Sequence, residues 1–253
     1  MLWPAGESWP MCDGPKGGDH FDSCPGEAAA PLVPVLQLFA ADVPELPFPD
    51  GTDLLQVLWC PFDHEPWGSP KPRLWWRRSA DVTTVASTPP PDAESAPRHV
   101  PAACVLDPER VVEYPVQELP RAVRDEIGDE IERIEEETGW SYDDDLSVAS
   151  GTKVGGYPGW TQDGVWPECD CGAVMHHVVT VASWEFSTGN EKRWIPLEDR
   201  VAMAEWRWDA PADHPAHRVK NPTGLMLGDV GGIYLFVCTV CPDRPSDYVF
   251  DCC

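Results

Sequence analysis

The chain has 253 residues, of which 43 are acidic and 18 basic, so its formal net charge at pH 7 is −25. Such a field repels phosphate backbones and attracts cationic proteins, which disfavours nucleic acid and favours a basic protein partner, unless the acidity serves only solubility. No apolar run has the length of a membrane span and the start lacks a signal peptide's pattern, so we expect a cytoplasmic protein with no membrane partner.

Residues 1–86 are expected to form a β-rich N-terminal half. After an irregular start rich in Gly, Pro and Trp, two apolar strands are predicted over 32–39 and 54–59, the first with a bulge or edge position at Pro34. The run RLWWRR over 73–78 predicts a third, short strand.

Residues 87–118 have the Pro-, Ala- and Ser-rich composition of a linker, with a connecting strand predicted over 104–114. Residues 119–139 are predicted to form one amphipathic helix. Pro120 suits its first turn, Gly139 its end, and its other face is strongly acidic. Such an acidic face is normally exposed to solvent, and the alternative is that it forms a docking surface. The apolar stripe consists of Leu119, Val123, Ile127, Ile131 and Ile134.

Residues 140–253 are expected to form a second half with the element order of the first. The entry WPMCD at 9–13 corresponds to WPECD at 166–170, and strands at 178–186 and 233–237 correspond to the two apolar strands above. The predicted fold is therefore α+β, with two related, mostly antiparallel β-rich halves that arose by internal duplication and one amphipathic linker helix.

Two close cysteine pairs indicate a metal site in the C-terminal half. Cys169 and Cys171 form a C-x-C pair, while Cys238 and Cys241 form a C-x-x-C pair directly after an apolar strand. Four thiolates that arrive as two pairs are typical of a structural zinc site. Disulfides within the pairs and buried free thiols are the alternatives.

The N-terminal half has four comparable residues at irregular spacing. They can form a second zinc site, but the spacing favours the degenerate remnant of one. The residues are Cys12, Cys24, Cys60 and His64.

The sequence carries little that indicates catalysis. It has no nucleophile elbow, no phosphate-binding loop before a helix, no HExxH motif and no dinucleotide fingerprint. His176 and His177 are adjacent on a predicted strand, so at most one of them can face a common site. A metal-dependent hydrolase, or another enzyme with an open zinc position, remains the alternative function.

A resemblance to known proteins lies over residues 152–245. The run KVGGYPGW, a Cys-bearing turn followed by Met, and GD-x-GG-x-YLFVC-x-x-C resemble the YwqG-like family of bacterial domains of unknown function. The same residues are similar to the eukaryotic programmed cell death 2 type proteins, a family associated with escorting a ribosomal protein. Relatives often carry a Gln on the strand after the Met, whereas here the amide occurs in the first half, at Gln37.

These observations together predict a non-catalytic protein-binding module, chaperone-like or immunity-type, with a structural zinc site. Its partner would be a basic polypeptide such as a ribosomal protein or a toxin. Aromatic side chains near acidic segments anchor cationic chains by packing and by cation–π contacts. The residues predicted to bind the partner are Tyr157, Trp160, Trp184, Trp206, Trp208 and Asp229.

Overall fold

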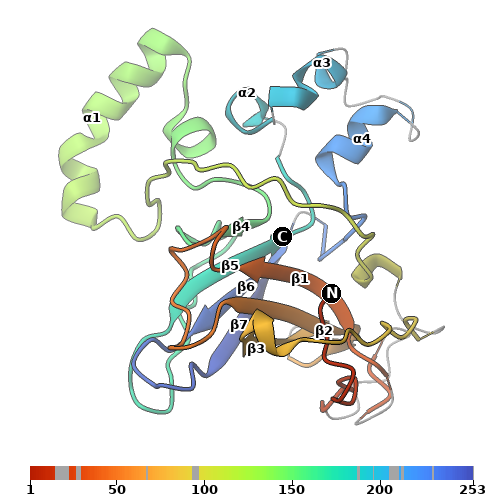
Figure 1. The fold of residues 1–253 in the computed structure, drawn as a ribbon. Coiled ribbons are helices and arrows are strands. Elements are labelled where there is room, and N and C mark those ends of the chain that lie inside the picture. Colours follow the sequence, from red (N-terminus) through yellow and green to blue (C-terminus); the bar gives the residue numbers. More distant parts are fainter. Residues whose placement is uncertain are drawn as a thin grey trace.

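The computed structural model describes residues 1–14, 23–26, 30–66, 68–92, 97–186, 189–195, 197–204, 211, 214–229 and 231–252. This part of the chain contains two antiparallel sheets and few helices, which confirms the predicted α+β class (Figure 1). Trp206 and Trp208 lie outside the described residues.

The first sheet has three strands in the order β1-β2-β3, so each strand pairs with the next one along the chain. The register between β1 and β2 shifts between Pro34 and Leu36, where the sequence predicts a bulge. The strands are β1 (Val33–Phe39), β2 (Leu54–His64) and β3 (Ser69–Arg77).

The second sheet has four strands in the order β4-β5-β6-β7. Its pairs β5-β6 and β6-β7 are antiparallel, as are β1-β2 and β2-β3 in the first sheet. The strands are β4 (Lys153–Val154), β5 (His176–Ala182), β6 (Gly232–Val237) and β7 (Ser246–Asp251).

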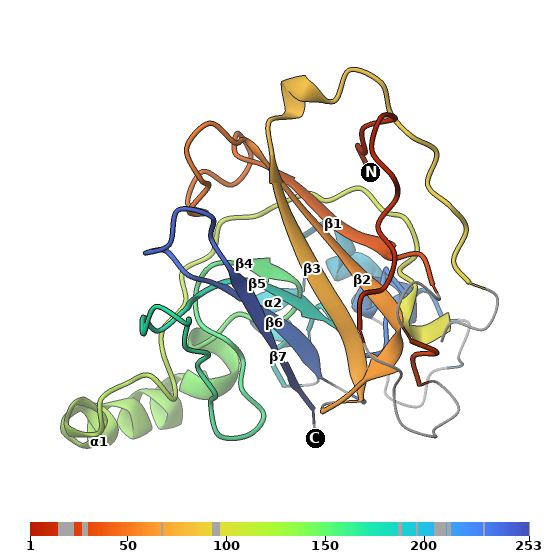
Figure 2. The ribbon, with the colours of Figure 1, turned by 90° about the horizontal axis from the view of Figure 1, so that it is seen from below.

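The two sheets share one apolar core. Alternate residues of β2, among them Val57 and Trp59, lie in the same cluster as alternate residues of β6, among them Ile233 and Leu235. The halves are therefore joined by a common core. Figure 2, which views the molecule from below, shows β3 and β7 side by side.

The opposite faces of β2 and β6 are buried as well. Leu58 and Cys60 on β2 pack with Trp3 of the N-terminal segment, while Phe236 on β6 and Cys238 directly after it pack against Trp160. Burial on both faces explains why both strands are nearly continuous apolar runs.

The predicted helix is present as α1 (Arg121–Thr138) and ends at Gly139, whose φ of 70° is left-handed. None of its residues is buried, and it lies at the edge of the molecule, away from both sheets (Figure 1). Three shorter helices lie in the long polar segment before β6. They are α2 (Glu191–Trp194), α3 (Arg200–Met203) and α4 (Pro215–Lys220). Within the described chain, no helix is long and apolar enough to cross a membrane.

The strand predicted over 104–114 is wrong, because this segment is irregular and exposed over most of its length. Its backbone is held near its ends, where the N–H groups of Ala102 and Tyr114 donate to Thr223 O and Ser147 O. An ion pair also joins Arg110 to Glu45. A strand needs a partner strand, and no residue of this segment pairs with a described strand.

The end of the predicted linker is fixed to the second half by a buried ion pair. Lys153 Nζ on β4 lies 2.8 Å from Glu113 Oε2, and both side chains are about nine-tenths buried, with 11% and 9% exposed. Glu113 also accepts hydrogen bonds from the backbone N–H groups of Ala149 and Tyr157. This carboxylate therefore holds the linker and two turns of the second half together.

Candidate metal centres

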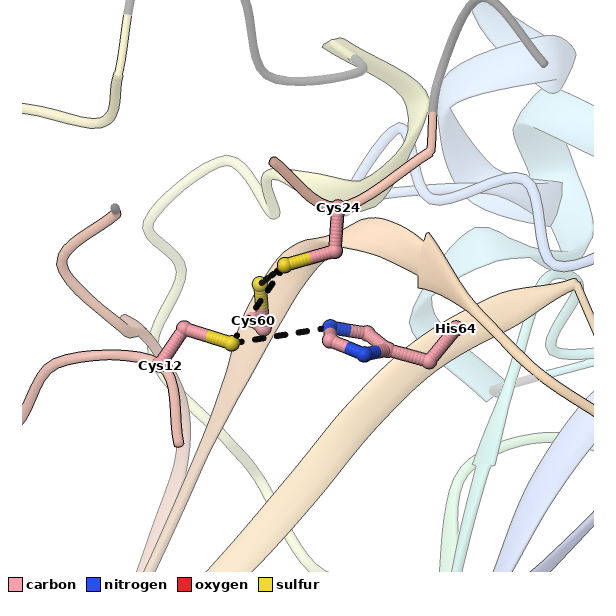
Figure 3. A group of neighbouring side chains, drawn as sticks. All are labelled: Cys12, Cys24, Cys60 and His64. Atoms are coloured by element: carbon pink, nitrogen blue, oxygen red, sulfur yellow. Dashed lines mark hydrogen bonds between the residues drawn. The ribbon is translucent and has the colours of Figure 1, made fainter. Parts of the chain in front are cut away.

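The N-terminal cluster consists of Cys12, Cys24, Cys60 and His64, which come from three separate segments (Figure 3). Cys60 and His64 lie on β2, whose register with β3 shifts between these two residues. Cys24 is held beside β2 because its backbone N–H donates to Asp63 O at 3.0 Å. The cluster thus depends on the fold rather than on close sequence spacing.

The ligand atoms of the N-terminal cluster converge on one point. Cys12 Sγ lies 3.5 Å from Cys24 Sγ and 3.7 Å from His64 Nε2, and Cys24 Sγ lies 3.9 Å from Cys60 Sγ. All four residues are buried, with at most 3% of each exposed. The interpretation of this set as a degenerate remnant rested on linear spacing, and the geometry instead favours a complete set of four ligands.

The C-terminal cluster consists of Cys169, Cys171, Cys238 and Cys241. Cys169 Sγ lies 3.8 Å from Cys241 Sγ, and Cys171 Sγ lies 3.7 Å from Cys238 Sγ. The structure therefore brings together all four residues that the sequence indicates. Cys171 is exposed and Cys241 is half-buried, so this cluster is open to solvent on one side.

The spacing of the sulfur atoms fits a metal ion and excludes disulfides. A tetrahedron with metal–sulfur bonds of about 2.3 Å has sulfur–sulfur edges of about 3.8 Å. The described sulfur pairs are separated by 3.5 to 3.9 Å, whereas a disulfide requires about 2.05 Å. None of the nine described cysteines forms a disulfide, and both clusters can hold a metal ion.

Each cluster favours a thiolate at one position even before a metal binds. Hydrogen bonds from the Cys60 thiol and from His64 lower the pKa of Cys12 to about 4, while the Cys12 thiolate and burial raise the pKa of Cys60. In the other cluster, the backbone N–H of Cys241 lowers the pKa of Cys238 to about 7. A bound cation would displace the remaining thiol protons.

The two clusters share a local backbone arrangement. Cys12 N donates to Ala30 O at 2.8 Å, and Cys169 N donates to Ala173 O, also at 2.8 Å. Directly before these cysteines, Met11 and Glu168 each form an isolated antiparallel bridge. Each first cysteine is thus held by the same two backbone contacts, which a tight turn closes at Cys169 and a longer segment closes at Cys12.

His177 is a structural residue, as expected for an inward histidine of β5. Its Nδ1 lies 3.2 Å from Gly156 O and its Nε2 lies 3.0 Å from Thr180 Oγ1, while His176 is exposed. Burial is the main cause that lowers the pKa of His177 to about 4, with a smaller contribution from Lys153. The two histidines therefore form no common site.

Acidification is expected to weaken the fold through His177. Its folded pKa of about 4 lies below its ordinary value of 6.5, so the unfolded chain takes up the proton first as the pH falls. The stabilisation is complete above pH 6.5 and is lost towards pH 4, which amounts to about 2 kcal/mol between pH 7 and pH 5. Urea unfolding of wild type and His177→Asn at both values measures it, and an equal loss in both proteins would contradict it.

The predicted partner-binding residues are only partly brought together. Trp184 Nε1 donates to Asp229 O at 3.0 Å, and Lys220 Nζ lies 4.0 Å above the Trp184 ring. Trp160 instead packs against Tyr234, with ring centroids 4.8 Å apart, in the apolar cluster that includes Cys169 and Cys238. Trp160 therefore supports the C-terminal cluster. Tyr157 is half-buried and linked through its backbone to Glu113.

The groove between the sheets does not suit a basic chain. A hollow of about 250 Å³ lies between β3 and β7, and no predicted partner-binding residue lines it within the described chain. Lys71 and Arg73 line it, both ion-paired with Asp13. Asp247 lines the hollow as well, so its charges are balanced and it offers no acidic surplus to the cationic partner that the sequence predicts for the groove.

Comparison with known proteins gives no relative for this chain. No family model matches it, and no curated protein or solved structure matches it either.

Proposed function

We propose that the chain is a non-catalytic protein-binding module, stabilised by two structural zinc ions, that holds a basic polypeptide. The observation that carries this proposal is the pair of four-ligand Cys/His clusters on a strongly acidic chain. The resemblance of residues 152–245 to the YwqG-like family and to programmed cell death 2 type proteins agrees with a chaperone-like or immunity-type role.

Zinc is the metal that fits these donor sets best. Three thiolates with one imidazole and four thiolates are both ligand sets of structural zinc sites, and each occupies all four tetrahedral positions. A catalytic zinc needs an open position for water or substrate, so these sets favour a structural role over the hydrolase alternative.

We further infer that the two halves arose by duplication. Three features support this inference. Both sheets contain three consecutive antiparallel strands, and both clusters begin at a W-P-x-C-D segment that forms an isolated bridge. The last ligands lie on the middle one of these strands in the first sheet and directly after it in the second. Cys60 and Cys238 then correspond. Cys60 follows Leu58, and Cys238 follows Phe236, at the alternate positions that face away from the shared core.

The charge of the chain supports a basic protein as the class of partner. A net charge of −25 speeds the capture of a cationic protein, and salt screens this attraction over about 10 Å at 0.1 M. Immobilised full-length chain should therefore retain a basic protein in stoichiometric amount at low salt and release it as salt is raised. Retention of no basic protein, together with metal-dependent hydrolysis of small substrates, would overturn the proposal.

A further inference from the structure

We propose that helix α1 and the hollow at its C-terminal end form the docking surface for a basic amphipathic helix of a partner protein. This inference rests on the proposed function, because it locates the surface that would hold the basic polypeptide.

Within the part of the chain that the structure describes, no element buries the apolar stripe of α1. Val123, Ile127, Ile131 and Ile134 lie within an arc of about 80° on the helix, since each residue advances it by about 100°. Val123 and Ile134 are each 38% exposed, and no residue of the helix is buried. A surface helix of a globular protein normally packs such a stripe against the core. The stripe of α1 is therefore available to another chain.

The apolar surface continues beyond the end of the helix. A hollow of about 320 Å³ is lined by Ile134 and Thr138 of α1, by Trp140 and Leu146 after it, and by Arg193 of α2. Trp140 is 39% exposed and Leu146 is 36% exposed. A concave site with an exposed Trp beside it can receive a bulky apolar anchor of a partner helix.

The charge around the stripe selects a basic occupant. Helix α1 contains eight carboxylates and three arginines. Arg133 already pairs with Glu130 and Glu137 on the same helix, and Arg121 pairs with Asp125, so the acidic surplus remains. Anionic membranes and nucleic acids are repelled by this surface, and so is a second copy of the same helix. A helix with lysines or arginines beside its apolar stripe complements it.

The lengths also define the partner segment. The 18 residues of α1 span about 27 Å, so a helix of similar length covers the whole stripe. Its apolar residues would recur every three or four positions, and its basic residues would flank them to meet carboxylates such as Glu126 and Glu130.

The test uses a defined probe, a labelled synthetic peptide of 18 residues made of Leu and Lys. Its leucines recur every three or four positions, so that they form one apolar stripe on a helix. Its control is a peptide of the same composition, shuffled so that no apolar stripe forms. Fluorescence anisotropy with the full chain should show binding of the amphipathic peptide that is at least about tenfold tighter than binding of the shuffled one.

Variants locate the binding surface. Ile127→Ser combined with Ile131→Ser should weaken binding of the amphipathic peptide by about tenfold or more, with unchanged thermal unfolding because neither side chain is buried. Val201→Ser is the matched control, since Val201 is an apolar residue of α3 that is 84% exposed. It should leave the affinity unchanged.

Each other outcome separates this inference from the proposed function. Equal binding by the wild type and the α1 variant would overturn α1 as the surface and leave the binding of basic chains in place. Equal binding of both peptides would show that charge alone acts, which also overturns the inference only. Binding of neither peptide would also overturn the inference, while the proposed function is decided separately by the immobilised-chain experiment.

Discussion

Cys60→Ser is expected to remove one of two zinc ions and to lower stability sharply. Cys60 is 1% exposed and lies at the centre of the N-terminal cluster, which joins the N-terminal segment to β2. Since the binding energy of a structural zinc is folding energy, the loss should exceed about 4 kcal/mol, or roughly 10 °C in the thermal midpoint. Cys238→Ser should act similarly on the C-terminal cluster.

Differential scanning fluorimetry and elemental analysis of the same samples measure both effects. Cys104→Ser is the matched control, because Cys104 is exposed and belongs to neither cluster. An unchanged thermal midpoint in Cys60→Ser, at unchanged metal content, would show that this cluster is a group of buried thiols.

Glu113→Ala is expected to be the second most damaging change, because it leaves Lys153 buried without a counter-charge. Burial already lowers the pKa of Lys153, and Glu113 Oε2 at 2.8 Å opposes that shift. Removal of one partner from a buried ion pair costs about 3–5 kcal/mol. Here the backbone N–H groups of Ala149 and Tyr157 also lose their acceptor.

Urea denaturation of a double-mutant cycle tests this account. Lys153→Met in the Glu113→Ala background should restore part of the stability, since no uncompensated charge then remains. Glu109→Ala, an exposed change in the same segment, should alter the unfolding free energy by less than about 0.5 kcal/mol. Equal losses in Glu113→Ala and Glu109→Ala would contradict the role of the ion pair.

The main elements of the fold follow from local patterns in the sequence. Continuous apolar runs predict β2 and β6, and the four-residue spacing of isoleucines predicts α1. Strand β7 was not predicted, because SDYVFD is half polar and pairs only along one edge of β6. The predicted strand at 104–114 has the right residues for a strand, but it pairs with none of the described strands.

The two metal centres differ in how far the sequence predicts them. The C-terminal cluster has paired ligands, one pair in a short hairpin and the other after a strand, so linear spacing suffices. In the N-terminal cluster, Cys24 reaches the others only through its backbone contact with β2. The repeated W-P-x-C-D motif was the sequence signal for this second cluster, because it makes Cys12 the counterpart of Cys169.

The aromatic residues were harder to assign, since a tryptophan serves equally well in a core and at an interface. Sequence alone places Trp160 beside acidic segments, whereas the fold packs it under the C-terminal cluster. The exposure of Ile134 and Trp140 could not be foreseen either, because a helical apolar stripe normally faces the core.

X-ray absorption at the zinc edge, together with elemental analysis of gently purified protein, tests the two-centre account most directly. The account predicts two zinc ions per chain in tetrahedral sites, with sulfur at about 2.3 Å as the dominant neighbour and nitrogen as a minor one. Cys60→Ser and Cys238→Ser should each retain one ion. Protein without stoichiometric metal, or metal surrounded mainly by oxygen, would contradict it.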